Sequence, residues 1–379
     1  MGIIFIEKNV ITYMIPVTQP FLPPLDEFNH YLEKIWKNKW LTNNGEFHQE
    51  FEQKLCEYLG VSYISLFTNG TLALITALQA LDITGEVITT PFSFVASTHA
   101  IWWNGIKPVF VDIESNTFTL DPDKIEAAIT NKTTAILPVH VYGNPCNIDA
   151  IQKIAAKHSL KVIYDAAHAF GVRKDGISIA QYGDLSVLSF HATKVFNTFE
   201  GGAIICHDEK TKRRIDDLKN FGIHDETTVV TPGINAKMNE FQAALGILQL
   251  QYIDSAIEKR KALVLHYRTL LQTVTGIYLL NDLEGITHNY SYFPIIINSK
   301  LYGKTRDELF EYLIQQGFHA RRYFYPLISQ FPPYKDLESS RKENLPIADT
   351  ISKNIICLPL YPDLSFHDVE TICGLLKGK

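Results

Sequence analysis

Short apolar runs alternate with amphipathic segments through most of the N-terminal half of the chain. Two helical segments come first, at residues 25–40 and 46–59. Runs of four to six apolar residues then recur, as expected of buried strands, at residues 63–67, 87–90, 109–112, 135–140, 162–165 and 185–190. Helical patterns begin between them, near residues 71, 94, 122 and 148. This alternation predicts an α/β fold with a mostly parallel sheet covered on both faces.

The pattern changes in the C-terminal part of the chain. Residues 238–280 are typical of helices, and residues 290–297 of a strand. A helix at 305–316, strands near 319–323 and 355–358, and a terminal helix from residue 366 follow. We predict a large domain at residues 15–260 and a smaller α+β domain at residues 261–379, although no linker or internal repeat marks the boundary.

Lys194 lies on a connection between two predicted core strands. The apolar run at 185–190 precedes it, and Gly201-Gly202 turns the chain into the next strand. Asp165 ends another strand and is followed by small residues, Ala166 and Ala167, that let a flat molecule approach the backbone. Connections between core strands carry chemistry more often than packing.

A lysine and a buried aspartate are the pair that pyridoxal 5′-phosphate (PLP) chemistry requires. The lysine amine forms a Schiff base with the cofactor aldehyde, and the carboxylate keeps the pyridine nitrogen protonated. The alternative for Lys194 is a solvated surface lysine, and the alternative for Asp165 is a helix cap. The flanking strands favour the cofactor interpretation for both residues.

The segment that follows the first sheet strand has the features of a phosphate site. Gly70 permits the backbone to turn, and the amides of Gly70 and Thr71 face outward at a helix N-terminus, which favours an anion. The Thr71 hydroxyl and Ser189, shortly before the lysine, add donors. An ordinary capped helix that binds nothing is the alternative.

Two aromatic side chains are candidates for contact with a flat cofactor ring. Phe94 follows a predicted strand and is placed to stack on one face, with a core phenylalanine as the alternative. His168 follows Asp165 by three residues and is placed to lie against the ring or to bond its phenolic oxygen. A satisfied buried histidine is the alternative for His168.

Composition excludes several other classes of protein. With 46% hydrophobic and 20% charged residues, a chain of 379 residues buries a large core. The 35 basic and 41 acidic residues form no footprint for nucleic acid, and no run is long enough to cross a membrane. The five cysteines show no metal-ligand spacing, so we expect no metal and a cytoplasmic enzyme. The apolar patch at residues 3–6 is too short for the hydrophobic region of a secretory signal, so we expect no signal peptide in residues 1–13 and assign them no role.

Taken together, these motifs resemble the DegT/DnrJ/EryC1/StrS family of PLP-dependent sugar aminotransferases. The matching segments span nearly the whole chain and include TNGTLAL, PFSFVAST, PVHVYG, YDAAHAFG, SFHATK, FEGG and GINAKMNEFQAALGILQL. The resemblance implies the PLP-dependent transferase fold of the aspartate aminotransferase type, with L-glutamate as the amino donor. It implies that Lys194 binds the cofactor aldehyde and that Asp165 faces the pyridine nitrogen. It also implies phosphate contacts from Gly70, Thr71 and Ser189, and ring contacts from Phe94 and His168.

Two further expectations follow from the resemblance. Asn235 matches the family asparagine that reaches the phosphate of the other subunit's cofactor, which implies a homodimer with shared active sites. Family members that act as sugar dehydratases carry histidine in place of the lysine. Because this chain keeps Lys194, transamination is favoured.

The resemblance also indicates the acceptor, a nucleotide-linked keto-6-deoxy sugar destined for a surface polysaccharide or a glycosylated product. The run Trp40-Leu41-Thr42-Asn43-Asn44-Gly45 is similar to members that aminate C4 of dTDP-4-keto-6-deoxyglucose. The segment SFHATKVFNTFEGG also resembles members that aminate C3 of a dTDP-3-keto-6-deoxyhexose, so C3 is the alternative. Candidate substrate contacts are Thr42, Arg321, Arg322 and Tyr323, since guanidinium groups suit a diphosphate; a strand with one charged face is the alternative for the last three.

Two other functions remain open at this stage. One is a catalytically idle regulatory protein of the same fold, which would have no need of Lys194, Asp165 and Thr71 together. The other is a different PLP enzyme, such as a glycine-dependent enzyme that forms carbon–carbon bonds or a sulfur-transferring lyase. The segment GINAKMNEFQAALG argues against this second alternative.

Overall fold

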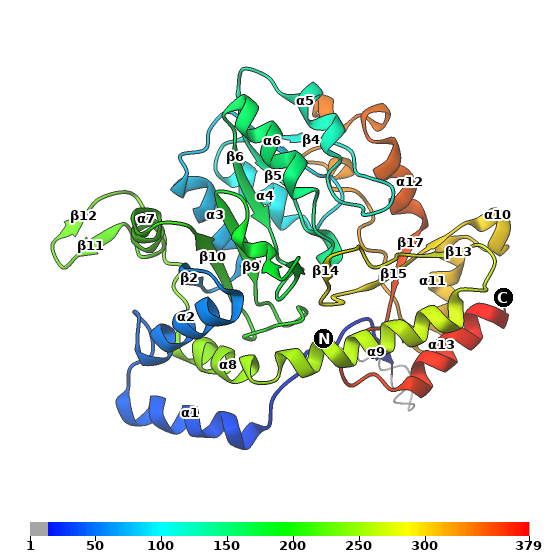
Figure 1. The fold of residues 1–379 in the computed structure, drawn as a ribbon, viewed down its shortest axis with the longest axis horizontal. Helices are drawn as coiled ribbons and strands as arrows, with labels where there is room; N and C mark the ends of the chain where they lie inside the picture. The colour runs from blue at the N-terminus through cyan, green and yellow to red at the C-terminus, as the bar shows by residue number, and fades with distance from the viewer. Residues whose placement is uncertain (1–13, 379) are drawn as a thin grey trace.

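A seven-stranded, mostly parallel sheet forms the centre of the molecule (Figure 1). The computed structural model describes residues 14–378, so residues 1–13, to which we assign no role, lie outside the described residues. The sheet order is β2 (Tyr63–Phe67), β10 (Gly202–Cys206), β9 (Leu185–Ser189), β6 (Lys161–Asp165), β5 (Thr133–Leu137), β3 (Glu86–Thr89) and β4 (Lys107–Phe110). Only β10 runs antiparallel to its neighbours. The carboxyl ends of the other six strands therefore meet at one edge.

Helices cover both faces of this sheet, as the alternation of the sequence predicts. The helices of this part are α1 (Leu25–Asn38), α2 (Glu46–Leu59), α3 (Gly70–Ala80), α4 (Ala96–Trp103), α5 (Ile125–Ala128), α6 (Ile148–His158), α7 (Glu209–Lys219) and α8 (Glu240–Leu250). One apolar cluster joins α2, α6 and α8 to the sheet, and a second joins α3, α4 and α7 to it. The two clusters make this part a three-layer α/β unit.

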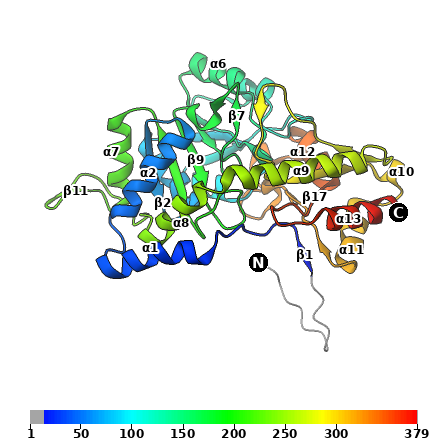
Figure 2. The same ribbon diagram turned by 60° about the horizontal axis from the view of Figure 1, so that its bottom comes forward.

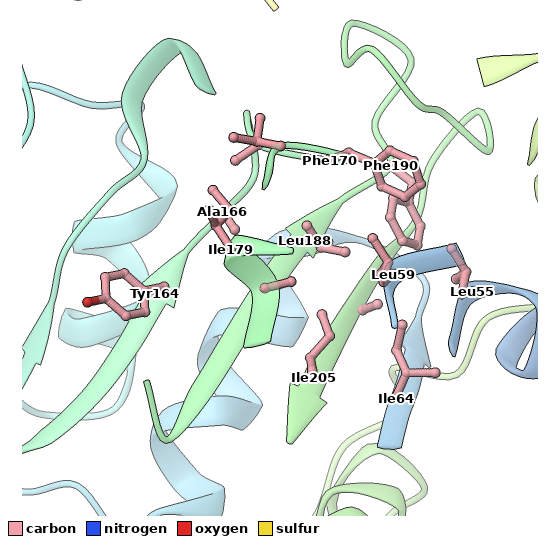
Figure 3. Close-up of a cluster of buried hydrophobic side chains, with 14 of the residues drawn as sticks. Leu55, Leu59, Ile64, Tyr164, Ala166, Phe170, Ile179, Leu188, Phe190 and Ile205 are labelled. Atoms are coloured by element: carbon pink, nitrogen blue, oxygen red, sulfur yellow. The ribbon is translucent and has the colours of Figure 1, made fainter. Parts of the chain in front are cut away.

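The first of these clusters shows how strands and helices share a core (Figure 3). Leu55 and Leu59 of α2 lie beside Ile64 of β2, Leu188 of β9 and Ile205 of β10. All five side chains are almost fully buried, and burial of each apolar side chain of this size contributes about 1.5–3 kcal/mol. This packing fixes β9, and with it the connection that carries Lys194.

Two contacts of α8 hold α2 in place. The Glu240 carboxylate accepts hydrogen bonds from the amides of Phe47 and His48, 2.9 and 3.0 Å away, which have no acceptor within α2. Gly246 lies against the ring of Phe51, and a Cβ at that glycine would come within 2.3 Å of the ring. The small residue in α8 therefore allows the two helices to approach closely.

A smaller antiparallel sheet follows in the C-terminal part (Figure 1). Its order is β13 (Ile277–Leu279), β15 (Phe293–Ile297) and β17 (Ile355–Leu358). The helices of this part are α9 (Ile253–Leu271), α10 (Ser299–Tyr302), α11 (Arg306–Gln315), α12 (Pro346–Asn354) and α13 (Phe366–Gly378). In both ribbon views α9 runs from α8 toward α13, and the predicted domain boundary at residues 260/261 falls inside it. The division into two domains stays a prediction.

The two parts are joined by shared packing and by hydrogen bonds. An apolar cluster contains Phe92 and Tyr142 from the large part and Phe324 and Cys357 from the small part. The buried Asp112 accepts hydrogen bonds from the amides of Ile347 and Ala348 at the start of α12. These contacts fix the small part against the edge of the central sheet at which the six strands end.

Short elements complete the fold. The paired strands are β1 (Ile15–Pro16) with β16 (Phe318–His319), β7 (Arg173–Lys174) with β8 (Ile177–Ser178) and β14 (Ile286–Thr287), and β11 (Ile223–Asp225) with β12 (Thr228–Val229). The β11–β12 hairpin projects from the body of the molecule (Figures 1 and 2). No helix among residues 14–378 is long and apolar enough to cross a membrane.

In the large part the predicted helices and strands agree with the structure to within two residues, except that the strand predicted at 135–140 ends at Leu137, before Pro138, which has no amide hydrogen to donate. The helix at 46–59 and the strands at 63–67 and 355–358 are confirmed without change. The prediction that residues 238–280 are helical is wrong at its end, where β13 pairs with β15. The strand predicted at 290–297 begins only at Phe293, because the Asn289 and Ser291 side chains donate to the carbonyl of His168. The strand predicted at 319–323 ends at His319.

Candidate active site

A cavity of about 230 Å³ lies at the carboxyl ends of the central strands. Crevices of this kind are where open α/β sheets bind ligands. Of the residues that the sequence singles out, the cavity is lined by Gly70, Thr71, Phe94, Asp165, His168, Ser189, Lys194 and Tyr323. The fold thus gathers into one crevice side chains that are as far apart in the chain as Gly70 and Tyr323.

Asp165 ends β6, and both of its carboxylate oxygens are held. Ser97 of α4 donates its hydroxyl to Oδ2 over 2.7 Å, and the amide of Ala167 donates to Oδ1 over 3.0 Å. Burial raises the pKa of the carboxyl, whereas these two hydrogen bonds and the nearby Lys194 oppose the rise. The carboxylate is therefore a buried, oriented acceptor for a cationic or N–H group.

Lys194 follows β9 on the connection to β10. Its backbone amide donates to the carbonyl of His191 over 2.8 Å, so this connection makes a tight turn. Burial lowers the pKa of the Lys194 ammonium to about 8, and the charge of Asp165 opposes this shift. With this pKa about a tenth of the amine is neutral at pH 7, far more than for a free lysine, and the neutral amine is the form that a nucleophile or a general base requires.

The N-terminus of α3 forms the anion-binding end of the cavity. Asn69 caps this helix by accepting a hydrogen bond from the amide of Leu72 over 2.9 Å. The amides of Gly70 and Thr71 precede Leu72 and have no acceptor within the helix. Ser189 lies directly opposite, since a Cβ at Gly70 would come within 2.9 Å of the Ser189 Cβ. Glycine at this position keeps the space between helix and strand open for a phosphate.

Aromatic groups line the remaining walls. The ring of His168 lies parallel to Phe324 at 5.8 Å and edge-on to Tyr292 at 5.1 Å. Its Nδ1 accepts a hydrogen bond from the amide of Tyr142, and burial lowers its pKa well below the usual range, so the ring is neutral. Phe94 is 57% exposed and lines the cavity, so its ring is free to cover a flat ligand.

Comparison with known proteins agrees with this geometry. The model of the DegT/DnrJ/EryC1/StrS aminotransferase family matches residues 25–377. The chain belongs to this aminotransferase family. It is 56% identical to an Escherichia coli protein named dTDP-4-amino-4,6-dideoxy-D-glucose transaminase, over 96% of this chain and 98% of the relative.

Solved structures confirm the fold class of this aminotransferase. DesI, crystallised in the presence of its TDP-sugar product, is 33% identical, with a TM-score of 0.92 over 96% of this chain and 92% of that structure. A Streptococcus pneumoniae protein solved in its PLP form is 26% identical, with a TM-score of 0.89 over 97% of this chain and 98% of that structure. The predicted PLP-dependent transferase fold, with its mostly parallel sheet, is therefore confirmed.

Four of the predicted site residues of the aminotransferase lie away from the cavity. Thr42 and Asn235 are exposed, and the Asn235 Oδ1 accepts a hydrogen bond from Lys237 Nζ over 2.9 Å. Arg322 pairs with Asp307 over 2.9 Å, and the exposed Arg321 lies beside the ring of Tyr323. Roles for these four residues stay predictions.

Sequence reasoning missed several residues that the cavity contains. Ser93 and Ser97 lie in the segment that carries Phe94, but their buried hydroxyls leave no periodic signal. Tyr292 and Phe324 come from the small part, and nothing local in the sequence connects them to Lys194. Only the packing of the two parts brings them to the aminotransferase cavity.

Proposed function

We propose that the protein transfers the amino group of L-glutamate to C4 of dTDP-4-keto-6-deoxy-D-glucose and thus forms dTDP-4-amino-4,6-dideoxy-D-glucose. The observation that carries this proposal is the 56% identity, over nearly the full length of both chains, to the Escherichia coli transaminase named for that product. The presence of Lys194 and Asp165 in one cavity supports an active enzyme over an idle regulatory protein.

PLP is the cofactor that the residues of the cavity fit. The family and the PLP form of a solved neighbour imply it. The α3 N-terminus with Thr71 and Ser189 would hold its phosphate, Asp165 its pyridine nitrogen and Lys194 its aldehyde carbon. When bound, PLP supplies a carbonyl that accepts the amino group and a ring that takes up electrons from the substrate.

The residues of the chain then perform the proton transfers. Neutral Lys194 Nζ removes the proton from the α-carbon of glutamate in the first half of the reaction. The same nitrogen delivers a proton to C4 of the keto sugar in the second half. Asp165 stays ionised and stabilises positive charge at its buried end of the cavity. Phe94 and the neutral His168 ring line the cavity and limit the access of water to the reacting atoms.

We further propose a homodimer with shared active sites. Asn235 is exposed on its own subunit and lies outside that subunit's cavity, so it is free to approach a second copy. Beside it in the chain, Ile234 is 37% exposed, and Phe221, whose amide donates to the Ile234 carbonyl, is 49% exposed, which is unusual for large apolar side chains. Sedimentation of the holoenzyme should give twice the mass of one chain, and a monomer would contradict the proposal.

The substrate assignment is tested by product analysis. Purified protein is incubated with PLP, L-glutamate and either dTDP-4-keto-6-deoxy-D-glucose or its 3-keto isomer, and the products are analysed by NMR. We expect an amino group at C4 with the gluco configuration, and formation of 2-oxoglutarate in equal amount. Amination of the 3-keto isomer alone would overturn the C4 assignment, and failure with both sugars would overturn the proposed acceptor.

The pKa of Lys194 predicts how cofactor uptake depends on pH. The amine attacks the PLP aldehyde only in its neutral form, and this fraction rises about tenfold per pH unit below the pKa. Because the pKa of Lys194 is about 8, we expect the rate constant of PLP uptake by the apoprotein to rise between pH 6 and pH 8 and then level off. Stopped-flow absorbance measures this rate. A profile that still rises between pH 9 and pH 10.5 would contradict the lowered pKa.

A further inference from the structure

The cavity contains a short, buried hydrogen bond from Ser97 to Asp165 that has no role in the proton transfers described above. The hydroxyl of Ser97 lies 2.7 Å from Oδ2 of Asp165, and the two residues are 1% and 4% exposed. A hydrogen bond to an ionised group is about twice as strong as one between neutral groups, and a dry environment strengthens it further. Ser97 is therefore placed to act on the charge of Asp165.

The position of the Ser97 hydroxyl proton follows from its neighbours. The carbonyl of Phe94 and the hydroxyl of Ser93 each lie 3.3 Å from Ser97 Oγ, farther away than the carboxylate. A hydroxyl has one proton to donate, and Ser97 donates it to the carboxylate because that acceptor is both closer and charged. Ser93, which is 4% exposed, is then free to donate to Ser97 Oγ. The result is a chain of two hydroxyls that ends on Asp165.

The chain of hydroxyls begins on the segment that also carries Phe94. Ser93 and Phe94 lie just before Val95, the N-cap of α4, and Ser97 lies in the first turn of that helix. Besides Asp165, the titratable side chains that line the cavity are His168, His191, Lys194, Glu200, Tyr292 and Tyr323, and Lys194 is the charged group among them that lowers the pKa of Asp165. His168 is neutral, so Lys194 and Ser97 are the two side chains that favour the ionised carboxylate.

We propose that Ser97 is a positioning residue that keeps the Asp165 carboxylate ionised and fixed in orientation for the pyridine nitrogen of PLP. This inference rests on the proposed function and deepens it. Without the hydroxyl, one buried carboxylate oxygen would lose its partner, and desolvation would favour the neutral acid. The ring nitrogen would then carry less positive charge.

The pH dependence of the visible absorption band of the holoenzyme reports this charge. Positive charge on the pyridine ring repels the proton on the Lys194 nitrogen and so lowers the pH at which that proton is lost. When the ring charge is lost, the proton stays on the nitrogen to higher pH. We expect Ser97→Ala to raise the midpoint of the spectral titration by about half a unit to one unit, and to raise the Kd for PLP by about tenfold. Ser93→Ala should shift the midpoint in the same direction by a smaller amount.

Thr98 provides a matched control on the same helix. Its side chain is fully buried, and its hydroxyl is among the buried oxygens of residues 14–378 for which no hydrogen-bond partner is present. Thr98→Val removes a hydroxyl at the position next to Ser97 and should leave both the midpoint and the Kd as in the wild type. Equal shifts in Thr98→Val and Ser97→Ala would overturn the proposal, because packing of α4 would then explain both.

Two conservative variants keep the proposal testable if Ser97→Ala does not fold. Ser97→Thr keeps a hydroxyl and should titrate as the wild type does. Ser97→Cys keeps the size but offers only a weak donor, so its midpoint should rise. A midpoint of Ser97→Cys or Ser97→Ala equal to that of the wild type would overturn the proposal. Absence of the visible band in the wild-type protein would instead refute PLP as the cofactor, and this inference with it.

Discussion

Replacing Lys194 by alanine should lower the rate of amino transfer by about 10⁴-fold or more, because the lysine side chain has two roles in the reaction and both are lost. The amine binds the cofactor aldehyde, and it moves the proton at the reacting carbon of both substrates. Its position after β9 and its lowered pKa suit it to both tasks. The change is measured as single-turnover rate constants with L-glutamate and with the keto sugar.

Three comparisons show whether the loss of activity is specific to the amine of Lys194. Lys194→Arg keeps the charge but offers no neutral amine, so it should be as inactive as Lys194→Ala. Lys153 is exposed on α6, and Lys153→Ala should keep full activity. Lys194→Ala should still bind PLP through the phosphate end of the cavity but lack the visible band of the lysine adduct. Activity of Lys194→Ala above about one per cent would show that another group moves the proton.

Replacing Asp165 by asparagine should lower the turnover rate of fully loaded enzyme by about 10²- to 10³-fold. Asparagine has the same shape, so the loss reports the negative charge rather than the space. A neutral amide does not stabilise positive charge at the pyridine nitrogen, and the ring then takes up electrons from the substrate less readily. The Kd for PLP should rise as well, because the buried ion pair with the cofactor is lost.

A matched control removes the charge of an aspartate outside the cavity by the same substitution. Asp149 lies on α6, is 67% exposed and pairs with Lys174, so Asp149→Asn should change neither turnover nor PLP affinity. Asp165→Glu restores a carboxylate on a longer side chain and should recover part of the rate. Wild-type turnover of Asp165→Asn at saturating PLP would show that the carboxylate has no electronic role.

The agreement between predicted and observed strands has a simple origin. Residues 63–67 and 355–358 are short, mostly apolar runs, and they form β2 and β17, which lie at the edges of their sheets but are almost entirely buried. Burial of an apolar run is favourable whichever elements pack against it, so the position of such a strand in the sequence depends little on distant contacts. Asp165 ends one such strand and Lys194 follows another, which explains how the two residues could be assigned to one site from the sequence.

The errors in the C-terminal part arise where distant contacts compete with local preference. Residues 290–292 have the composition of a strand, but the neighbouring Asn289 donates to the carbonyls of His168 and Phe170. These two hydrogen bonds provide donors for two buried backbone carbonyls of the large part. The strand β15 therefore begins only after this segment, at Phe293. Local pattern contains no information about such hydrogen bonds.

The sequence by itself determined the fold class, the order of the central elements and the residue types for PLP chemistry at the ends of strands. It did so because apolar periodicity and the residues next to a strand are local properties. Only the tertiary structure decided that Tyr292, Tyr323 and Phe324 close the cavity and that Ser97 holds Asp165. Those contacts join residues 68 or more positions apart, and their geometry depends on how the two parts of the molecule pack.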